Sequence, residues 1–288
     1  MADRVVMAPM PPGVHPGIPE AVYHADDSAL SVSGAKWLLP PSTPAVFQWR
    51  REHPEDIVST DAFDFGHAAH RTVLGIGPTI RYVDAKDWRT KDARNEALAA
   101  RALGEVPLLR KNEGVLETMV ANIRAHPLAS RLLDPDAGAP EQSLYQVDPE
   151  TGVMLRGRLD YLPHTTGRRM IVCDLKTAIS ADPDEFGKAA ANNGYDMQDA
   201  WYRDLINLLR LDPDPGFVFV VVEKSPPYLV NVVALNAEAV RIGRIRNRRA
   251  IRTYAECLAA DAWPGYPAEV NAVNLPVWYT REYEEISA

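Results

Sequence analysis

The sequence predicts an α/β fold in which a mixed central β-sheet is flanked by helices and preceded by a helical N-terminal flank. Three observations predict this fold. Helical patterns fill most of the first half of the chain, short β-rich segments begin near residue 143, and further helical and β-rich segments then alternate. Three strands, helices, two strands and a helix in that order are typical of one mixed sheet with helices packed on it.

Capping and breaking residues predict the helices of the first half. Ser33 can cap a short helix that Pro40 ends, and Pro44 suits the first turn of the next helix. Gly75 is a typical stop signal for a third helix, and Pro127 closes the last one. The expected helices span residues 33–39, 44–52, 61–74, 91–103 and 112–126.

The second half is predicted to supply the sheet. The first two strands are joined by Asp148 to Gly152, a hairpin-type turn. The expected strands span residues 143–147, 153–161, 170–175, 217–223 and 228–235, and the expected helices span residues 184–191, 195–210 and 237–260.

Composition divides the chain into an arm and one domain. Residues 1–20 contain five of the 24 prolines and are expected to form a flexible, Pro-rich arm. Residues 21–288 are expected to form a single domain, with a helical front at about 30–135, a catalytic core at about 141–235, and a C-terminal helix and tail at 236–288.

Composition also excludes several classes of protein. Apolar residues make up 46% of the 288 residues and charged residues 24%, which is typical of a folded globular chain. The longest apolar run, residues 217–222, is too short to cross a bilayer, and no secretory segment is evident, so we expect a cytoplasmic protein. Two cysteines cannot form a disulfide scaffold or a four-cysteine cluster. The net charge of −8 argues at first sight against nucleic-acid binding.

An acid and a lysine stand together at the end of a predicted buried strand. Asp174 and Lys176 face the same side because strand side chains alternate. Such a pair can hold a cation and stabilise developing charge or help to deprotonate a water, although an exposed strand-end ion pair explains the same spacing. Asp160, at the end of the preceding strand, can converge with Asp174, and Glu141 is a third candidate acid. Carboxylates brought together need a cation between them, and oxygen ligands favour Mg²⁺ or Mn²⁺ over zinc.

Two helices offer further site residues. On the helix from residue 61, His70 follows Gly66, which we expect to allow close packing of the helix; His67 lies three residues earlier and shares that face. Either imidazole could complete a metal shell or be a satisfied core residue. Gln198 and Tyr202 lie four residues apart on a later helix and could orient a phosphate or a water, or form the polar edge of an amphipathic helix.

Taken together, these motifs resemble those of a known nuclease family. The pattern is Gly66-x-x-x-His70, Gly157-Arg-x-Asp160, Asp174-x-Lys176 and Gln198-x-x-x-Tyr202. In this order it resembles the RecB-like branch of the PD-(D/E)XK superfamily, and is most similar to the RecE-type phage recombination exonucleases. Segments such as Tyr23-His24 and Trp263-x-Gly265-Tyr266 resemble the two ends of that domain, so the resemblance covers about residues 21–280.

The resemblance implies a fold and a role for each residue. The fold would be a restriction-endonuclease-like core. His70, Asp160, Asp174 and the backbone carbonyl of Leu175 would bind Mg²⁺ or Mn²⁺, with Glu141 as an additional candidate ligand. The family pattern selects His70 over His67. The catalytic set would comprise Lys176, Asp174, Asp160, Gln198 and Tyr202.

The function expected from this resemblance is metal-dependent hydrolysis of DNA. The resemblance implies a 5′-to-3′ exonuclease on linear double-stranded DNA in homologous recombination. It also implies a homo-oligomeric ring and a single-strand annealing protein as partner. An endonuclease on the same fold and a catalytically weak DNA-binding accessory protein are the alternatives. Two cysteines exclude the iron–sulfur cluster of related branches, and no Gly-x-x-x-x-Gly-Lys phosphate loop is present.

Charge placement answers the objection raised by the net charge. A stripe at helical spacing is formed by Arg241, Arg244, Arg248 and Arg252, in a twelve-residue stretch without acids. This arginine stripe could follow DNA phosphates, or it could be a solvated helix face or pair with acids of a neighbouring subunit. Arg50 and Arg51 are a further candidate for contact with DNA.

Overall fold

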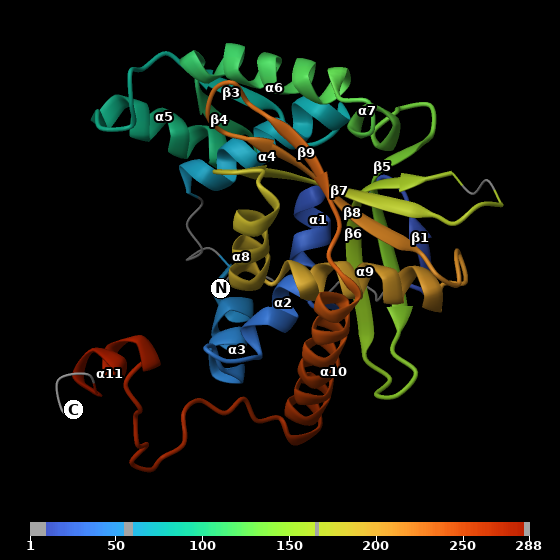
Figure 1. Ribbon diagram of the computed structural model, residues 1–288, viewed down its shortest axis with the longest axis vertical. Coiled ribbons are helices and arrows are strands. Elements are labelled where there is room, and N and C mark those ends of the chain that lie inside the picture. Colours follow the sequence, from blue (N-terminus) through green and yellow to red (C-terminus); the bar gives the residue numbers. More distant parts are fainter. Residues whose placement is uncertain (1–9, 55–59, 165–166, 285–288) are drawn as a thin grey trace.

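A seven-stranded mixed sheet with helices on both faces forms the body of the protein (Figure 1). The computed structural model describes residues 10–54, 60–164 and 167–284. The predicted fold class, a mixed central sheet flanked by helices, is confirmed.

The elements follow one another along the chain with helices concentrated at the two ends and strands in the middle. The helices are α1 (Glu20–Ala25), α2 (Val32–Trp37), α3 (Pro44–Glu52), α4 (Asp61–Leu74), α5 (Lys91–Ala102), the 3₁₀ helix η2 (Arg110–Asn112), α6 (Glu113–Ala125), α7 (Ala129–Leu132), α8 (Pro183–Asn193), α9 (Tyr195–Leu208), α10 (Ala237–Ala260) and α11 (Val277–Glu284). The strands are β1 (Gly13–His15), β2 (Leu30–Ser31), β3 (Ile80–Val83), β4 (Val106–Leu109), β5 (Gly138–Val147), β6 (Met154–Pro163), β7 (Ile171–Ala178), β8 (Gly216–Glu223) and β9 (Val230–Val233).

The main sheet runs in the order β1-β5-β6-β7-β8-β9, and β2 adds to β6. β5 and β6 form the long hairpin that the turn at Asp148 to Gly152 predicts, with Val147 opposite Met154. β7 and β8 are parallel over eight residue pairs, as expected for strands joined through α8 and α9. β3 and β4 form a separate parallel pair beside α5.

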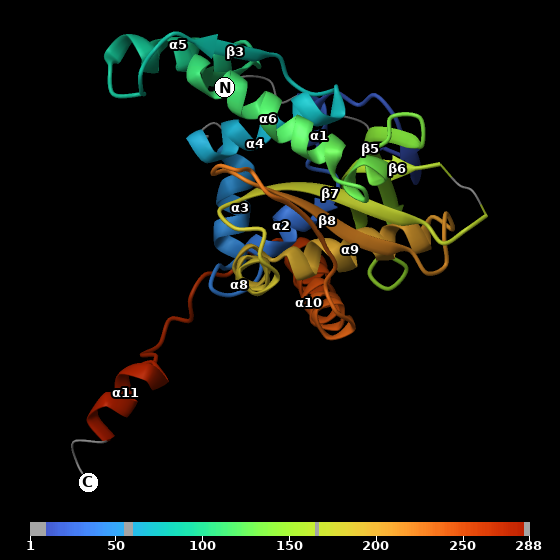
Figure 2. The same cartoon turned by 45° about the horizontal axis from the view of Figure 1, so that its top comes forward.

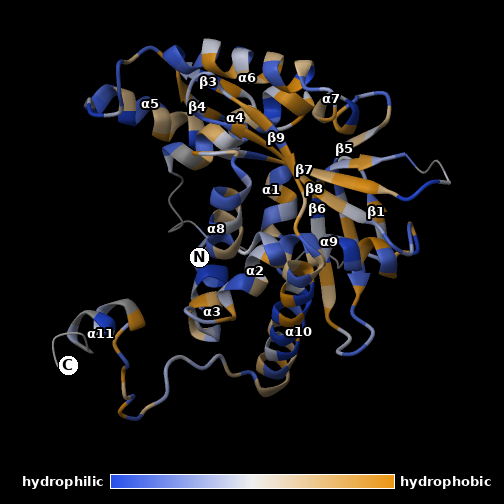
Figure 3. Ribbon diagram, in the orientation of Figure 1, coloured by the Kyte–Doolittle hydropathy of each residue, from blue (hydrophilic) through white to orange (hydrophobic). Residues whose placement is uncertain are grey.

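Two apolar layers hold the helices against the sheet. On one face, Leu205 and Ile206 of α9 and Ile251 of α10 pack against the strands together with α2. On the other face, Met119 and Ile123 of α6 pack on the sheet beside α4. Figure 2 shows α4 and α6 on one side of the sheet and α2, α8, α9 and α10 on the other. The strands β7 and β8 between these layers are among the most hydrophobic parts of the chain (Figure 3).

The structure corrects the predicted start of the chain. Residues 1–9 of the predicted arm lie outside the described residues, but Gly13 to His15 are not a flexible arm. They form β1, paired antiparallel with β5, and the ring of His15 packs edge-on against Tyr145. The prolines flank this strand instead of interrupting it, and an edge strand tolerates them. The cap of α2 is Ser31, whose side chain accepts a hydrogen bond from Gly34, and not Ser33.

The C-terminal segment leaves the body of the protein. Trp263 stacks on Phe47 of α3, and the carbonyl of Pro264 accepts a hydrogen bond from Ala45. Beyond this contact the chain is extended until α11, which stands apart from the rest in both views (Figures 1 and 2). Within the described ranges, no helix is both long and apolar enough to cross a bilayer.

Candidate metal centre

The centre of the site is the place where β6 and β7 separate. In the described part of the chain one residue pair, Tyr161 with Cys173, joins these strands. At the next position a side chain joins the two strands: Oδ2 of Asp160 accepts a hydrogen bond from the backbone N–H of Leu175 at 2.7 Å. The Asp160 carboxylate therefore accepts a hydrogen bond that a backbone carbonyl would accept in a continuous ladder. Beyond this point β6 and β7 diverge, and Asp160 lies where the wedge between them begins.

α4 places an imidazole over this wedge. His70 Nε2 lies 2.8 Å from the carbonyl oxygen of Leu175, and its Nδ1 lies 3.5 Å from Asp160 Oδ2. α4 is fixed at its start by Thr60, whose side chain accepts a hydrogen bond from Phe63, and it ends at Gly75 in the left-handed conformation. The structure thus brings His70, Asp160 and the Leu175 carbonyl together as the sequence predicts.

Gly66 has a different role from the one expected. A Cβ added at Gly66 would meet nothing within 4 Å, so this glycine does not permit close packing against another element. It lines the cavity instead. The close approach occurs at Gly157 of β6, where an added Cβ would lie 2.6 Å from the ring of Tyr202.

Glu141 completes a group of three possible ligands. The sequence suggests a position ahead of the first strand, but Glu141 lies within β5, between residues paired with Leu159 and Tyr161 of β6. Its φ of 52° is unusual for a side-chain-bearing residue. Ligand atoms of His70, Glu141 and Asp160 all lie within 4.8 Å of one another.

The electrostatics of these acids fit a cation. Burial, together with the Asp160 carboxylate, raises the pKa of Glu141 to about 7. Burial, together with the Asp174 carboxylate, raises the pKa of Asp160 to about 6. Crowded, buried carboxylates are costly to ionise unless a positive charge lies between them. Carboxylates, a carbonyl and one imidazole form a donor set suited to Mg²⁺ or Mn²⁺, and the residues present therefore fit a divalent metal.

Asp174 and Lys176 form a second, adjoining group. Lys176 Nζ lies 2.6 Å from Asp174 Oδ2, and Gln198 donates a hydrogen bond of 2.6 Å to Asp174 Oδ1. Burial acts to lower the pKa of Lys176, but the carboxylates of Asp174 and Asp160 outweigh burial and raise it. The ammonium group is therefore protonated and suited to stabilising negative charge. Asp174 is nearly fully buried and lies outside the three-residue ligand group.

The last predicted residue, Tyr202, is held by the backbone. Its hydroxyl donates a hydrogen bond of 2.8 Å to the carbonyl of Arg158, and its ring lies against Gly157. Arg158 does not pair with Asp160. Its guanidinium contacts the hydroxyl of Ser143, the carbonyl of Ile18 and, at 3.8 Å, the carboxylate of Glu141.

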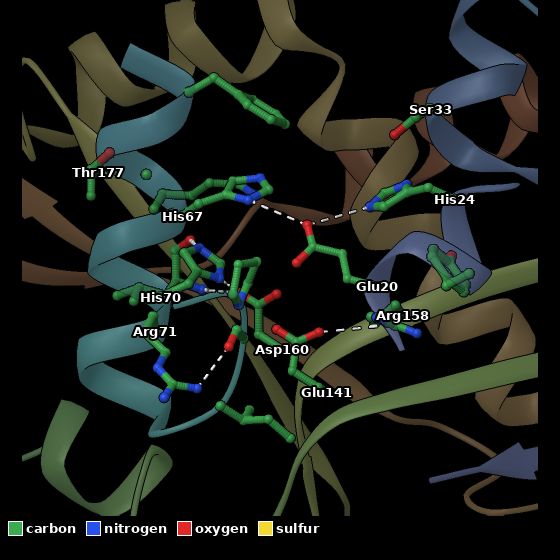
Figure 4. Close-up of a pocket in the computed structure, with 18 of the residues that line it drawn as sticks. Glu20, His24, Ser33, His67, His70, Arg71, Glu141, Arg158, Asp160 and Thr177 are labelled. Atoms are coloured by element: carbon green, nitrogen blue, oxygen red, sulfur yellow. Dashed lines mark hydrogen bonds and ion pairs between the residues drawn. The ribbon is translucent and has the colours of Figure 1, made fainter. Parts of the chain in front are cut away.

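These groups line a cavity of about 440 Å³ that includes residues the sequence did not single out for the site. Glu20 of α1 points into it between two imidazoles, with Oε1 3.3 Å from His67 Nδ1 and 3.8 Å from His24 Nε2 (Figure 4). Burial lowers the pKa of both histidines. The signal for His24 lay in the Tyr23-His24 segment, whereas Glu20 follows a proline-rich stretch and gave none.

The arginine stripe lies on α10, and its arginines are paired with acids of the same chain. Each of its four members forms an ion pair with an acid from α9, from the β5–β6 turn or from its own helix. The pairs are Arg241 with Glu238, Arg244 with Asp204, Arg248 with Asp148 and Arg252 with Glu150. Neutralised arginines attract phosphate less than free ones, so contact between this stripe and DNA stays a prediction.

The wedge between the two strands gathers acids and a lysine, and the helix above it supplies a histidine. This arrangement defines the PD-(D/E)XK class of nuclease fold. Comparison with family models agrees: residues 31–276 match the family described as "PDDEXK-like domain of unknown function (DUF3799)", and the chain belongs to that family. No curated protein matches the chain.

Solved structures support the fold. A protein from Eubacterium rectale, titled "Putative exonuclease", superposes with a TM-score of 0.60 at 13% identity, over 92% of this chain and 98% of that one. A phage-related exonuclease from Haemophilus somnus 129PT gives a TM-score of 0.33 at 12% identity, over 81% and 96%. At these identities the first likeness shows a shared fold, and the second superposes too loosely to add to it.

Proposed function

We propose that the protein is a metal-dependent deoxyribonuclease that hydrolyses phosphodiester bonds. One observation carries the proposal: Asp160, His70 and the Leu175 carbonyl converge where β6 and β7 separate, beside the ion pair of Lys176 with Asp174. The family match supports a nuclease fold, and the complete set of acid, lysine and histidine argues against a degenerate site.

The residues divide the chemistry between them. Hydrolysis forms a bond from a water oxygen to phosphorus and breaks the bond from phosphorus to the leaving oxygen, which takes up a proton. A divalent cation held by His70, Asp160 and the Leu175 carbonyl would lower the pKa of a bound water and neutralise phosphate charge. Lys176 stabilises the extra negative charge of the transition state. Asp174 holds the ammonium group of Lys176 in place, and Gln198 holds the carboxylate of Asp174.

We further propose a RecE-type mode of action: 5′-to-3′ digestion of linear double-stranded DNA in homologous recombination, with Mg²⁺ as the cofactor. The resemblance of the motifs to those of RecE-type exonucleases supports this mode, and the printed name of the Eubacterium rectale structure agrees with an exonuclease. Arg241 and Arg252 are the members of the stripe proposed to contact DNA, because phosphate could displace their exposed partners Glu238 and Glu150.

The test is hydrolysis of an end-labelled linear duplex with Mg²⁺, comparing the wild type with Asp174→Ala and Lys176→Ala. We expect losses of several powers of ten in both variants, because charge stabilisation dominates such barriers. Equal activity in all three proteins would refute the site. A covalently closed circle tests the mode: an exonuclease spares it, whereas an endonuclease cuts it.

The proposed assembly is a homo-oligomeric ring around duplex DNA that hands single strands to an annealing protein. Light scattering after gel filtration tests the ring, and a monomer at working concentration would contradict it. Co-purification with a candidate annealing protein, in the presence of nuclease-resistant DNA, tests the partner.

A further inference from the structure

An exposed group of aromatic residues lies on α2 and α3. Trp37 of α2 and Trp49 of α3 are 39% and 47% exposed. The guanidinium carbon of Arg50 lies 4.0 Å from the centre of the Trp37 ring, and the ring of His53 stacks on Trp49 at 4.8 Å. We call Trp37, Trp49, Arg50 and His53 the aromatic ledge.

The aromatic ledge is the face of α3 that the fold does not use. The opposite face sends Phe47 against Trp263 and Tyr254, which secures the helix to the body. Trp49 and His53 lie one turn apart, so they form a stripe pointing away from that contact. Large flat side chains left in water on a helix that is already anchored indicate a surface for a partner.

The ledge continues the wall of the cavity. Ser33, on α2, lines the cavity and points toward it (Figure 4). Trp37 follows four residues later on the same helical face, about 6 Å further along the axis. Phe63, which is 56% exposed, also lines the cavity. An extended ligand leaving the cavity along α2 therefore meets Trp37 first.

Charge favours an anionic occupant. In the described part of the chain Arg50 has no ion-pair partner, whereas its neighbour Arg51 pairs with Asp27 at 3.6 Å. Arg50 therefore differs from the four arginines of the stripe on α10, each of which forms an ion pair with an acid. A cation next to flat aromatic rings matches alternating phosphates and bases better than it matches an aliphatic protein surface.

We propose that the aromatic ledge binds single-stranded DNA that runs to or from the cavity. Bases stack on Trp37 and Trp49, and Arg50 contacts the backbone phosphate between them. Stacking of this kind tolerates any sequence, because every base has a flat face. The proposal rests on the proposed function for its substrate, but it concerns binding and not hydrolysis.

The test is binding of a fluorescein-labelled oligothymidine to the full chain in EDTA, followed by fluorescence anisotropy. We expect Trp37→Ala and Trp49→Ala each to weaken binding by about 5- to 100-fold. Trp37→Phe should restore most of the affinity, because a phenyl ring still stacks. Arg50→Gln should reduce the slope of log affinity against log salt by about one. Leu98→Ala, which removes a still more exposed apolar side chain on α5, is the control.

Two outcomes overturn the proposal. Unchanged affinity in both tryptophan variants, with thermal unfolding like that of the wild type, overturns it. If a tryptophan variant sediments at a lower mass than the wild type while its affinity for the oligonucleotide is unchanged, the proposal is overturned. The aromatic ledge would then be a contact between copies of this chain. Failure of the nuclease is distinguishable: with Mg²⁺, the wild type would then not hydrolyse the end-labelled linear duplex, yet binding of the oligothymidine in EDTA would still depend on Trp37.

Discussion

Replacing Glu141 by Gln tests the electrostatics of the site in a direct way. Glu141 is buried beside Asp160, and its pKa rises from 4.5 to about 7. Between these two values the folded chain keeps a proton that the unfolded chain has released. The free energy of unfolding therefore falls as the pH rises through this range, and the full cost is present above pH 7.

The size of the effect follows from the shift. A rise of about 2.5 units corresponds to about 3 kcal/mol, and the 23% exposed side chain reduces this to about 1 to 3 kcal/mol. Without a cation, Glu141→Gln should thus be more stable than the wild type by that amount at pH 8. Near pH 4.5, where the wild-type carboxyl is protonated, the two proteins should unfold at nearly the same denaturant concentration.

The assay is urea unfolding in EDTA at several pH values, repeated with saturating Mg²⁺. Mg²⁺ should stabilise the wild type more than the variant, because the cation offsets the cost of two adjoining carboxylates. Glu269→Gln, at an exposed position in the C-terminal segment, serves as the control and should show no pH-dependent difference. A stability difference between Glu141→Gln and the wild type that is the same at pH 4.5 and pH 8 would refute the reasoning.

Four further predictions concern other residues. Gly66→Ala should stabilise the fold by about 0.5 to 1 kcal/mol in thermal unfolding, because its methyl group meets no protein atom, yet slow hydrolysis by filling the cavity. Gly157→Ala, where a methyl group would clash with an aromatic ring, should destabilise the fold in the same assay. Arg248→Ala should lower the free energy of unfolding by about 2 to 4 kcal/mol, because it leaves a buried carboxylate unpaired, whereas the exposed Arg241→Ala should change it by less than about 1 kcal/mol. Lys176→Met should abolish hydrolysis while the Mg²⁺-dependent rise in melting temperature persists. The opposite result for any of these variants would contradict the structural contact from which its prediction is drawn.

Local signals predicted the long elements well. α3, α4 and α10 begin and end at the predicted residues, because Thr43, Thr60 and Asn236 cap them and each has a clear stop. The short elements at the front of the chain were missed. β1 and β2 depend on partners more than a hundred residues away, and no local pattern of period two marks strands of two or three residues.

The sequence predicts that certain acids and a histidine lie close together, but it does not predict how they are arranged. The spacing of Asp160 and Asp174 on neighbouring strands is visible in the sequence, and so is a histidine at a helical position. The sequence does not show that the Asp160 carboxylate replaces a backbone carbonyl in the ladder, because this depends on how the two strands diverge. Likewise the stripe of arginines is visible, but the acids that neutralise it come from as far as Asp148, a hundred residues earlier.

The separation of β6 from β7 has a consequence for any inactive version of the protein. Substituting Asp160 with Ala would remove the acceptor of the Leu175 N–H as well as a proposed ligand, so only the Tyr161–Cys173 pair would still join β6 to β7. A binding study made with such a mutant would report on a loosened scaffold. Asp160→Asn keeps an oxygen in place and is the version in which lost activity and intact architecture can be separated.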